Sequence, residues 1–294
     1  MVRIIFLTSL VMLLWSICYP LIVLTIPYAP LMQTAFLRAL LGGLFLLLCA
    51  LVLRRPFPNK SFHTWMVISV IGFTATTIGF WGMFYAGSLI SPGLATVLTN
   101  TQPLIASLLA VVILKEVIHR FVLIGILLGF AGIAIIGLNG ALDNNADTIY
   151  GVIYIVCAAL GIAISNVLLK KNSNQIDIFY AMSGQLIIGS LPLMILVPTI
   201  KIVPALSWDL TYFVILMMLA IPGTALPFLI WFWLMDKAPL NQLNIFSFLT
   251  PIFGLVIGWV YFEESLSPWQ WMGVVTVIVG VVISVLPKPS APKK

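Results

Sequence analysis

The chain has 294 residues, of which 62% are hydrophobic and only 7% are charged. Soluble globular proteins carry about a quarter charged residues, so this composition excludes an ordinary water-soluble domain. The formal net charge is +6, and its distribution along the chain is informative about topology.

Apolar runs long enough to cross a bilayer as helices, about twenty residues each, follow one another along the chain. The strands of a membrane barrel would alternate polar and apolar residues over about ten positions, whereas these runs are continuously apolar. The sequence therefore predicts an all-α membrane protein with the lipid bilayer as its solvent. Ten transmembrane helices are expected at 4–26, 30–53, 64–86, 92–114, 119–138, 149–169, 177–199, 210–235, 239–262 and 268–286.

The first run, 4–26, could be mistaken for a signal peptide. Its apolar stretch is longer than the usual core of about 7–15 residues, and no small-residue cleavage site follows it. We therefore interpret it as the first span.

Basic residues support this topology through the positive-inside rule. If the N-terminus is cytoplasmic, only Lys201 falls outside, and Arg38 lies within a helix. The sequence thus predicts a bacterial inner (plasma) membrane protein with both termini in the cytoplasm, and the positive charge gives no reason to expect nucleic acid as a partner. The twelve basic residues on the cytoplasmic side are Arg3, Arg54, Arg55, Lys60, Lys115, Arg120, Lys170, Lys171, Lys237, Lys288, Lys293 and Lys294.

One apolar motif occurs twice. PLIASLLAVVILKE runs from Pro103 to Glu116, and PIFGLVIGWVYFEE runs from Pro251 to Glu264, 148 residues later. In both copies glycines follow the glutamate at the same spacings, so the motif predicts two five-helix repeats, 1–145 and 146–294. Because five is odd, the second repeat must be inverted, an architecture typical of alternating access. Pro103 and Pro251, which interrupt helical hydrogen bonding, are the expected hinges.

Several of these pieces resemble one known family. They are Trp15–Ser16, the AFLRALLGG stretch around Arg38, the repeated proline-to-glutamate motif, and WFWLMDKAP from Trp231 to Pro239. Together they resemble the EamA-type branch of the drug/metabolite transporter superfamily over essentially the whole chain. The resemblance implies a ten-helix transporter whose central cavity is lined chiefly by helices one, three, four, six, eight and nine. Members move amino acids or other small metabolites, and sister branches move nucleotide sugars or cationic drugs.

Polar side chains at membrane depth are expensive unless they face the interior of the bundle, which makes them site candidates. Thr96 and Asn100 lie one turn apart in helix four, and Asn244 and Ser247 lie three residues apart in helix nine. The offset of 148 pairs Thr96 with Asn244. The alternative is hydrogen bonding between helices, worth about 0.6 kcal/mol per pair. Helices one and six add the cavity candidates Ser16, Tyr19, Ser165 and Asn166.

Aromatic residues form a second group of candidates: Trp15 on helix one, Trp81 and Tyr85 on helix three, and Trp231 on helix eight. The alternative for them is a belt at the membrane surface, where tryptophan and tyrosine concentrate. An aromatic cavity with amide groups suits a small neutral or zwitterionic solute.

Arg38 lies about 12 Å into helix two at 1.5 Å per residue, and its guanidinium needs acceptors. It could bind a substrate carboxylate or be anchored to backbone carbonyls. Because the resemblance implies an arginine here in members with varied substrates, the structural role is favoured.

The positions of the acidic residues, cysteines and histidines limit the possible functions. No Asp or Glu falls in mid-membrane, which disfavours proton-coupled efflux of cations, and the scattered cysteines and histidines suggest neither disulfides nor a metal site. No cofactor is expected. The predicted function is export of small metabolites, chiefly neutral or aromatic amino acids.

Two alternatives stay open. A nucleotide-sugar or other organic-anion carrier would need several basic residues in the cavity, where only Arg38 is available. A membrane-embedded enzyme would need a nucleophile with a base at membrane depth. The small-x3-small patterns Gly125–Gly129 and Gly254–Gly258 predict close helix packing, and a homodimer through helices five and ten is also left open.

Overall fold

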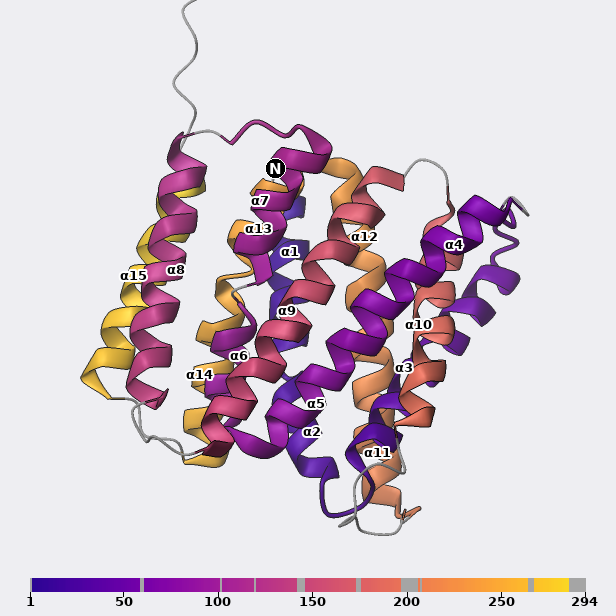
Figure 1. Ribbon diagram of the computed structural model, residues 1–294, viewed down its shortest axis with the longest axis horizontal. Helices are drawn as coiled ribbons and strands as arrows, with labels where there is room; N and C mark the ends of the chain where they lie inside the picture. Colours follow the sequence, from indigo (N-terminus) through magenta and orange to yellow (C-terminus); the bar gives the residue numbers. More distant parts are fainter. Residues whose placement is uncertain are drawn as a thin grey trace, which may run out of the picture.

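The computed structural model consists of helices over the residues that it describes (Figure 1). The described ranges are 2–58, 61–100, 102–118, 120–141, 146–172, 176–196, 206, 208–263 and 267–285. Backbone groups in lipid must bond internally, and helices achieve this within a single segment. Residues of the sequence analysis that lie outside the described ranges are Lys60, His119, Lys201, Glu264, Lys288, Lys293 and Lys294.

The helices differ widely in length, because several of the predicted ones are divided into segments. In chain order they are α1 Val2–Ser16, α2 Cys18–Thr25, α3 Leu31–Val52, α4 Phe62–Ile71, η1 Gly72–Ile78, α5 Gly79–Leu89, α6 Pro92–Thr99, α7 Gln102–Leu114, α8 Arg120–Ala141, α9 Ala146–Asn172, α10 Ile178–Ile195, α11 Leu210–Ala220, η3 Ile221–Ala225, α12 Leu226–Lys237, α13 Leu240–Phe246, α14 Leu249–Phe262 and α15 Pro268–Val285.

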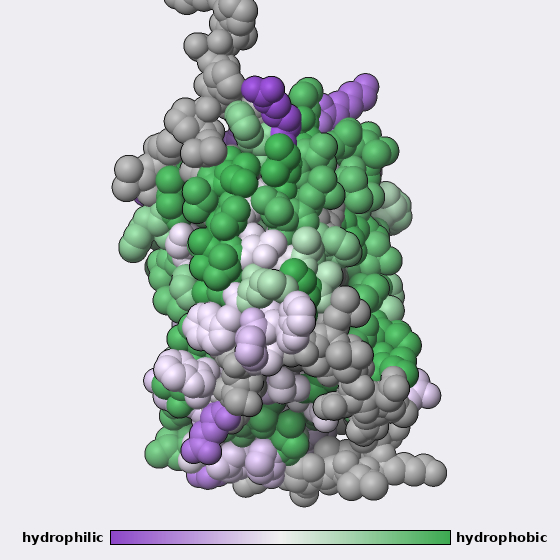
Figure 2. All heavy atoms as spheres, turned by 90° about the vertical axis from the view of Figure 1, so that its left-hand side faces the viewer, coloured by the Kyte–Doolittle hydropathy of each residue, from purple (hydrophilic) through white to green (hydrophobic). Residues whose placement is uncertain are grey.

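The protein is a multi-pass membrane protein. Within the described part of the chain, seven helical stretches are long and apolar enough to cross a membrane. Three shorter apolar helices, Ile105–Leu114, Arg120–Gly132 and Trp271–Gly280, fall within predicted helices four, five and ten, so the count of ten stays a prediction. Large apolar side chains face outward, and Figure 2 shows them covering most of one described face, with hydrophilic residues gathered near its two ends.

Five predicted helices carry irregularities, and the sequence analysis expected interruptions in only two of them, helices four and nine, at Pro103 and Pro251. Helix one is divided at Ile17, helix four after Thr99 and helix nine after Phe246. Helices three and eight contain the π-helical segments η1 and η3. Pro103 and Pro251 lie in the first turns of α7 and α14, where a missing N–H leaves no helical bond unmade.

Corresponding elements of the two halves follow the sequence offset. Adding 148 to the first residue of α8 gives the first residue of α15, and adding 148 to the bounds of η1 gives 220–226, against 221–225 for η3. This correspondence fits a layout of two repeats. α8 and α15 lie side by side at one edge of the bundle (Figure 1), while α6 packs against α14 and α7 against α13.

The glycine patterns permit close approach of helices. A Cβ on Gly280 of α15 would lie 2.8 Å from the Gly125 carbonyl oxygen of α8, and one on Gly254 would lie 2.6 Å from a methyl carbon of Thr96. One of the two closest glycine contacts joins α10 to η1. There a Cβ on Gly189 would lie 2.3 Å from the Gly72 carbonyl oxygen, a backbone atom that cannot rotate away.

We therefore expect Gly189→Ala to lower stability by about 1–3 kcal/mol, the usual effect of overpacking. The measurement is the apparent melting temperature of the purified protein in detergent. Gly87→Ala is the matched control, because its added Cβ would approach no atom closer than 3.3 Å. Equal melting temperatures for the two variants would contradict the close α10–η1 contact.

Candidate functional site

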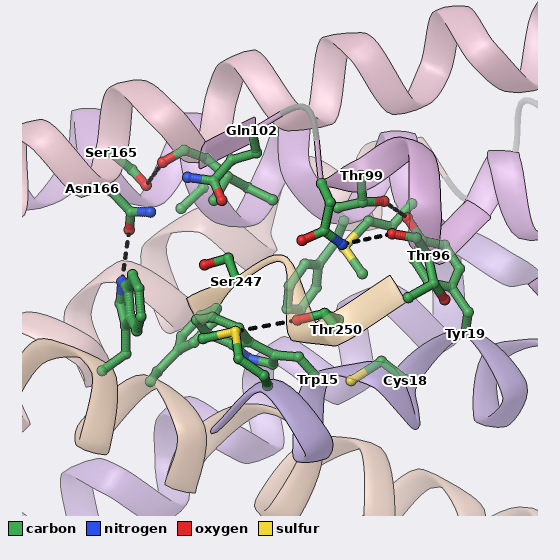
Figure 3. Close-up of a pocket in the computed structure, with 18 of the residues that line it drawn as sticks. Trp15, Cys18, Tyr19, Thr96, Thr99, Gln102, Ser165, Asn166, Ser247 and Thr250 are labelled. Atoms are coloured by element: carbon green, nitrogen blue, oxygen red, sulfur yellow. Dashed lines mark hydrogen bonds between the residues drawn. The ribbon is translucent and has the colours of Figure 1, made fainter. Parts of the chain in front are cut away.

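A cavity of about 100 Å³ lies inside the bundle, where the breaks in predicted helices one, four and nine come together (Figure 3). Its walls come from α1, α2, α3, η1, α5, α6, α7, α9, α10, α12 and α14, together with Asn100 and Ser247 at the helix breaks. The lining is mostly apolar, with a small set of hydroxyl and amide groups. Such a combination is common in sites for small molecules.

Most of the candidates from sequence meet at this cavity. Figure 3 shows Gln102, Ser165 and Asn166 in one part of it and Tyr19, Thr96 and Thr99 in another. The candidates that line the cavity are Trp15, Tyr19, Arg38, Thr96, Asn100, Ser165, Asn166, Trp231 and Ser247.

Four candidates lie elsewhere. Ser16 is fully buried and donates to the Leu13 carbonyl at 2.7 Å. Asn244 donates to Ser107 Oγ at 3.3 Å and to the Pro103 carbonyl at 3.4 Å, and so ties α13 to α7. The remaining two, Trp81 and Tyr85, pack on a tyrosine of α9, Tyr154, with ring centroids 5.0 and 5.1 Å from it.

Several lining residues were missed in the sequence analysis. Thr99 and Gln102 flank the predicted Asn100, and Thr250 follows the predicted Ser247 by three residues. The polar clusters predicted on helices four and nine were therefore too short. Gln185 is an amide at membrane depth on α10, and that signal was visible in the sequence. It was missed because the resemblance did not place helix seven at the cavity.

The break in helix four is stabilised locally by its own side chains. Thr96 donates to the Pro92 carbonyl at 2.7 Å, and Asn100 Nδ2 donates to the Thr96 carbonyl at 2.8 Å. The hydroxyls of Thr99 and Tyr19 share a hydrogen bond of 2.5 Å, which joins α6 to α2 across the cavity wall. The side chains of Thr96 and Asn100 therefore add second hydrogen bonds to carbonyls of α6.

Aromatic rings form the opposite wall. Trp15 lies between Trp231, at 5.4 Å between ring centroids, and Phe228, at 6.0 Å in an edge-on arrangement. Trp231 Nε1 donates to Asn166 Oδ1 at 3.3 Å, which fixes the indole orientation and connects α12 to α9. This wall offers an apolar surface to a solute.

Arg38 is held on two sides of its guanidinium and is only 2% exposed. Nε donates to Thr224 Oγ1 at 2.7 Å, while Nη2 lies 3.2 Å from both the Gly223 carbonyl oxygen and Cys18 Sγ. The Phe80 ring lies 4.5 Å from Cζ, in cation–π range. The third nitrogen, Nη1, is buried and has no hydrogen-bond partner among the residues that the structure describes.

No Asp, Glu or His is among the described residues that line the cavity. Across the described ranges, no group of three His, Cys, Asp or Glu side chains is placed to hold a metal ion. The lining can therefore bind a solute through one positive charge, a few amides and hydroxyls, and aromatic faces.

Two capping contacts close the bundle near the ends of α7, α9 and α12. Glu116 Oε1, in the first copy of the repeated motif, accepts a hydrogen bond of 3.0 Å from the backbone N–H of Leu240 at the start of α13. Lys170 Nζ donates to the carbonyls of Met235 and Ala238 at the end of α12, the latter at 2.9 Å. Both contacts place a charge where the helix dipole favours it.

Comparison with known proteins identifies the family. The model of the EamA-like transporter family matches residues 2–138 and again residues 149–286. The chain is 30% identical to the uncharacterized transporter sll0355 of Synechocystis over 262 residues, covering 84% of this chain and 79% of the relative. It is 25% identical to the uncharacterized transporter YvbV of Bacillus subtilis, covering 94% and 89%. The chain belongs to the EamA-like transporter family, and it is a membrane transporter.

Two further matches cover most of the chain. Protein PecM of Dickeya dadantii is 25% identical over 272 residues, covering 92% of this chain. A solved crystal structure superposes with a TM-score of 0.78 over 97% of each chain at 16% identity, which shows a shared fold.

The anchoring of Arg38 can be tested through Thr224. We expect Thr224→Val to lower stability by about 1–3 kcal/mol, because it leaves a buried charged donor without its acceptor. Thr76 is the matched control: it lies 148 residues earlier, is fully buried, and its hydroxyl oxygen has no partner. Thr76→Val should be neutral or stabilising. Thermal unfolding in detergent compares them, and equal losses would show that the Arg38–Thr224 bond contributes nothing.

Proposed function

We propose that this member of the EamA-like transporter family is a secondary transporter that exports small metabolites, chiefly neutral or aromatic amino acids, across the bacterial inner membrane. The observation that carries the proposal is the cavity at the helix breaks. It is small, largely apolar and partly aromatic, and it presents one cation and several amides. Discontinuous helices around a midplane site are typical of secondary transporters.

The proposed topology has ten transmembrane helices in two inverted repeats, 1–145 and 146–294, with cytoplasmic termini. The repeated motif and the double match of the family model support it. The start of α1, the ends of α3, α7, α9 and α12 and the start of α8 lie at one end of the molecule (Figure 1). These ends carry basic residues, so the positive-inside rule favours this end as cytoplasmic.

Size and charge favour an amino acid over the alternatives. A volume of about 100 Å³ suits a small solute rather than a nucleotide sugar. A phosphorylated substrate would also need several cations, and Arg38 is the one basic residue among those that line the cavity. Trp15, Phe228 and Trp231 give an aliphatic or aromatic side chain an apolar surface.

The contacts of Glu116 and Lys170 are proposed to hold the cytoplasmic side closed in this conformation. Glu116 joins the end of α7 to the start of α13, and Lys170 joins the end of α9 to the end of α12. The cavity lies further inside the bundle. Opening toward the cytoplasm would break both contacts. Alternating access then requires these bonds to form and break in each cycle.

Substrate class is tested by counterflow in proteoliposomes loaded with an excess of unlabelled solute. We expect uptake of labelled leucine to be competed by aliphatic and aromatic amino acids, but not by a nucleotide sugar or a quaternary-ammonium drug. Trp231→Phe should weaken exchange, since it removes the N–H that holds Asn166. Trp81→Phe, outside the cavity lining, is the control. Failure of every amino acid to exchange, with exchange of another solute of the panel, would overturn the proposed substrate.

Closure is tested by the reactivity of Cys18, which lines the cavity. In a Cys49→Ala, Cys157→Ala background it is the single cysteine of the chain. A membrane-impermeant maleimide is applied to inverted vesicles. Hydrogen bonds from charged groups contribute about 1.5–3 kcal/mol, so Lys170→Met should raise labelling by about tenfold or more. Exposed Lys171 provides the control, Lys171→Met. Equal rates for the two variants would contradict the proposed closure.

A further inference from the structure

Three side chains that line the cavity each carry a buried polar atom without a hydrogen-bond partner among the described residues: Arg38, Gln102 and Gln185. Arg38 Nη1 is a charged donor, and its neighbours Nε and Nη2 are already bonded to Thr224, Gly223 and Cys18. The guanidinium is therefore fixed in place with one nitrogen left over. A buried charged donor that makes no hydrogen bond costs free energy. This cost favours an acceptor group of a ligand at this position.

The second group is the side-chain oxygen of Gln185. Gln185 lies on α10, is 2% exposed and lines the same cavity as Arg38. Its Oε1 is buried and accepts no hydrogen bond. An amide oxygen accepts and cannot donate, so its complement on a ligand is an N–H or O–H group.

The surrounding charge distribution favours a ligand with both groups. The cavity lining contains the Arg38 cation and no carboxylate to balance it. The N-termini of α7 and α14 lie at the cavity beside the C-termini of α6 and α13, so the partial charges of these helix ends offset one another and Arg38 is the main source of positive potential. A carboxylate would balance this field. A ligand carrying an ammonium group as well would remain neutral overall and would also satisfy the Gln185 oxygen.

We propose that Arg38 and Gln185 together recognise the zwitterionic head group of the substrate. Arg38 Nη1 donates to the substrate carboxylate, and Gln185 Oε1 accepts from the substrate ammonium. The aromatic wall of Trp15, Phe228 and Trp231 takes the side chain. This inference rests on the proposed function and deepens it: the cavity selects for the head group and tolerates variation in the apolar part.

The first test compares leucine with two analogues that each lack one charged group. In leucine counterflow with the unaltered protein, 3-methylbutylamine lacks the carboxylate and 4-methylpentanoate lacks the ammonium. Each should compete about tenfold or more weakly than leucine, because each leaves one hydrogen bond to a charged group unmade. Competition by either analogue as strong as that by leucine would overturn the proposal.

The second test uses Gln185→Met. Because Gln185 Oε1 has no partner in the described part of the chain, the substitution leaves no described protein group unpaired and should preserve the fold. Leucine should then lose its advantage over 4-methylpentanoate, so that the ratio of their inhibition constants falls about tenfold toward one. The advantage of leucine over 3-methylbutylamine, which depends on Arg38, should persist.

Gln102→Met is the matched control. Gln102 lines the same cavity from α7, and its unpartnered atom is the donor Nε2 rather than an acceptor. In the control, the ratio of the inhibition constants of leucine and 4-methylpentanoate should stay as in the unaltered protein, even if both compounds bind more weakly. An unchanged ratio in Gln185→Met, or an equal fall in Gln102→Met, would refute the assigned role of Gln185.

The outcomes separate this inference from the function on which it rests. If no amino acid exchanges in the unaltered protein, the proposed function fails. If amino acids exchange but their amines or acids compete equally, the function stands and the recognition by Arg38 and Gln185 is wrong.

Discussion

Arg38 carries a full positive charge at membrane depth, where insertion of such a residue costs about 2.5–3.5 kcal/mol at the centre of a helix. The structure meets this cost without a carboxylate among the cavity residues. A hydroxyl, a carbonyl and a thiol, all from η3 and α2, accept the bonds of Nε and Nη2. The arginine consequently fastens α3 to η3 and α2, and both α2 and α3 contribute residues to the cavity wall.

The π-helical segment η3 is what makes this anchoring possible. In η3 the Thr224 hydroxyl donates to the carbonyl of Leu219, five residues earlier, and accepts from Arg38. The Gly223 carbonyl also accepts from Arg38, and Pro227, four residues further on, has no N–H with which to bond that carbonyl in a regular helix. Single-turn π segments often occur at functional sites. Here the hydroxyl of Thr224 and the carbonyl of Gly223, both in η3, supply the acceptors.

Much of the architecture followed from the sequence, because hydrophobic run length and the repeated motif report directly on membrane spans and duplication. Nine of the thirteen cavity candidates line the cavity, since polar residues avoid lipid. The positions of the helix breaks were less predictable. Pro103 and Pro251 indicated interruptions in helices four and nine, but Thr96 and Asn100 fitted an intact helix equally well. The placement of Trp81 and Tyr85 against Tyr154 depends on helix rotation, which sequence spacing alone does not determine.

The two halves of the chain differ most informatively at positions that the sequence repeat relates. At the offset of 148, Thr76 corresponds to Thr224, yet only Thr224 receives a bond from an arginine. Arg38 corresponds to Leu186, the immediate neighbour of Gln185, so related places in the two halves present a donor and an acceptor. A repeated scaffold by itself would offer the same chemistry on both sides of the cavity. When the two related positions carry different residues, the cavity has a hydrogen-bond donor at one position and an acceptor at the other. A solute can then place its carboxylate at the donor and its ammonium at the acceptor, while its side chain contacts the aromatic wall.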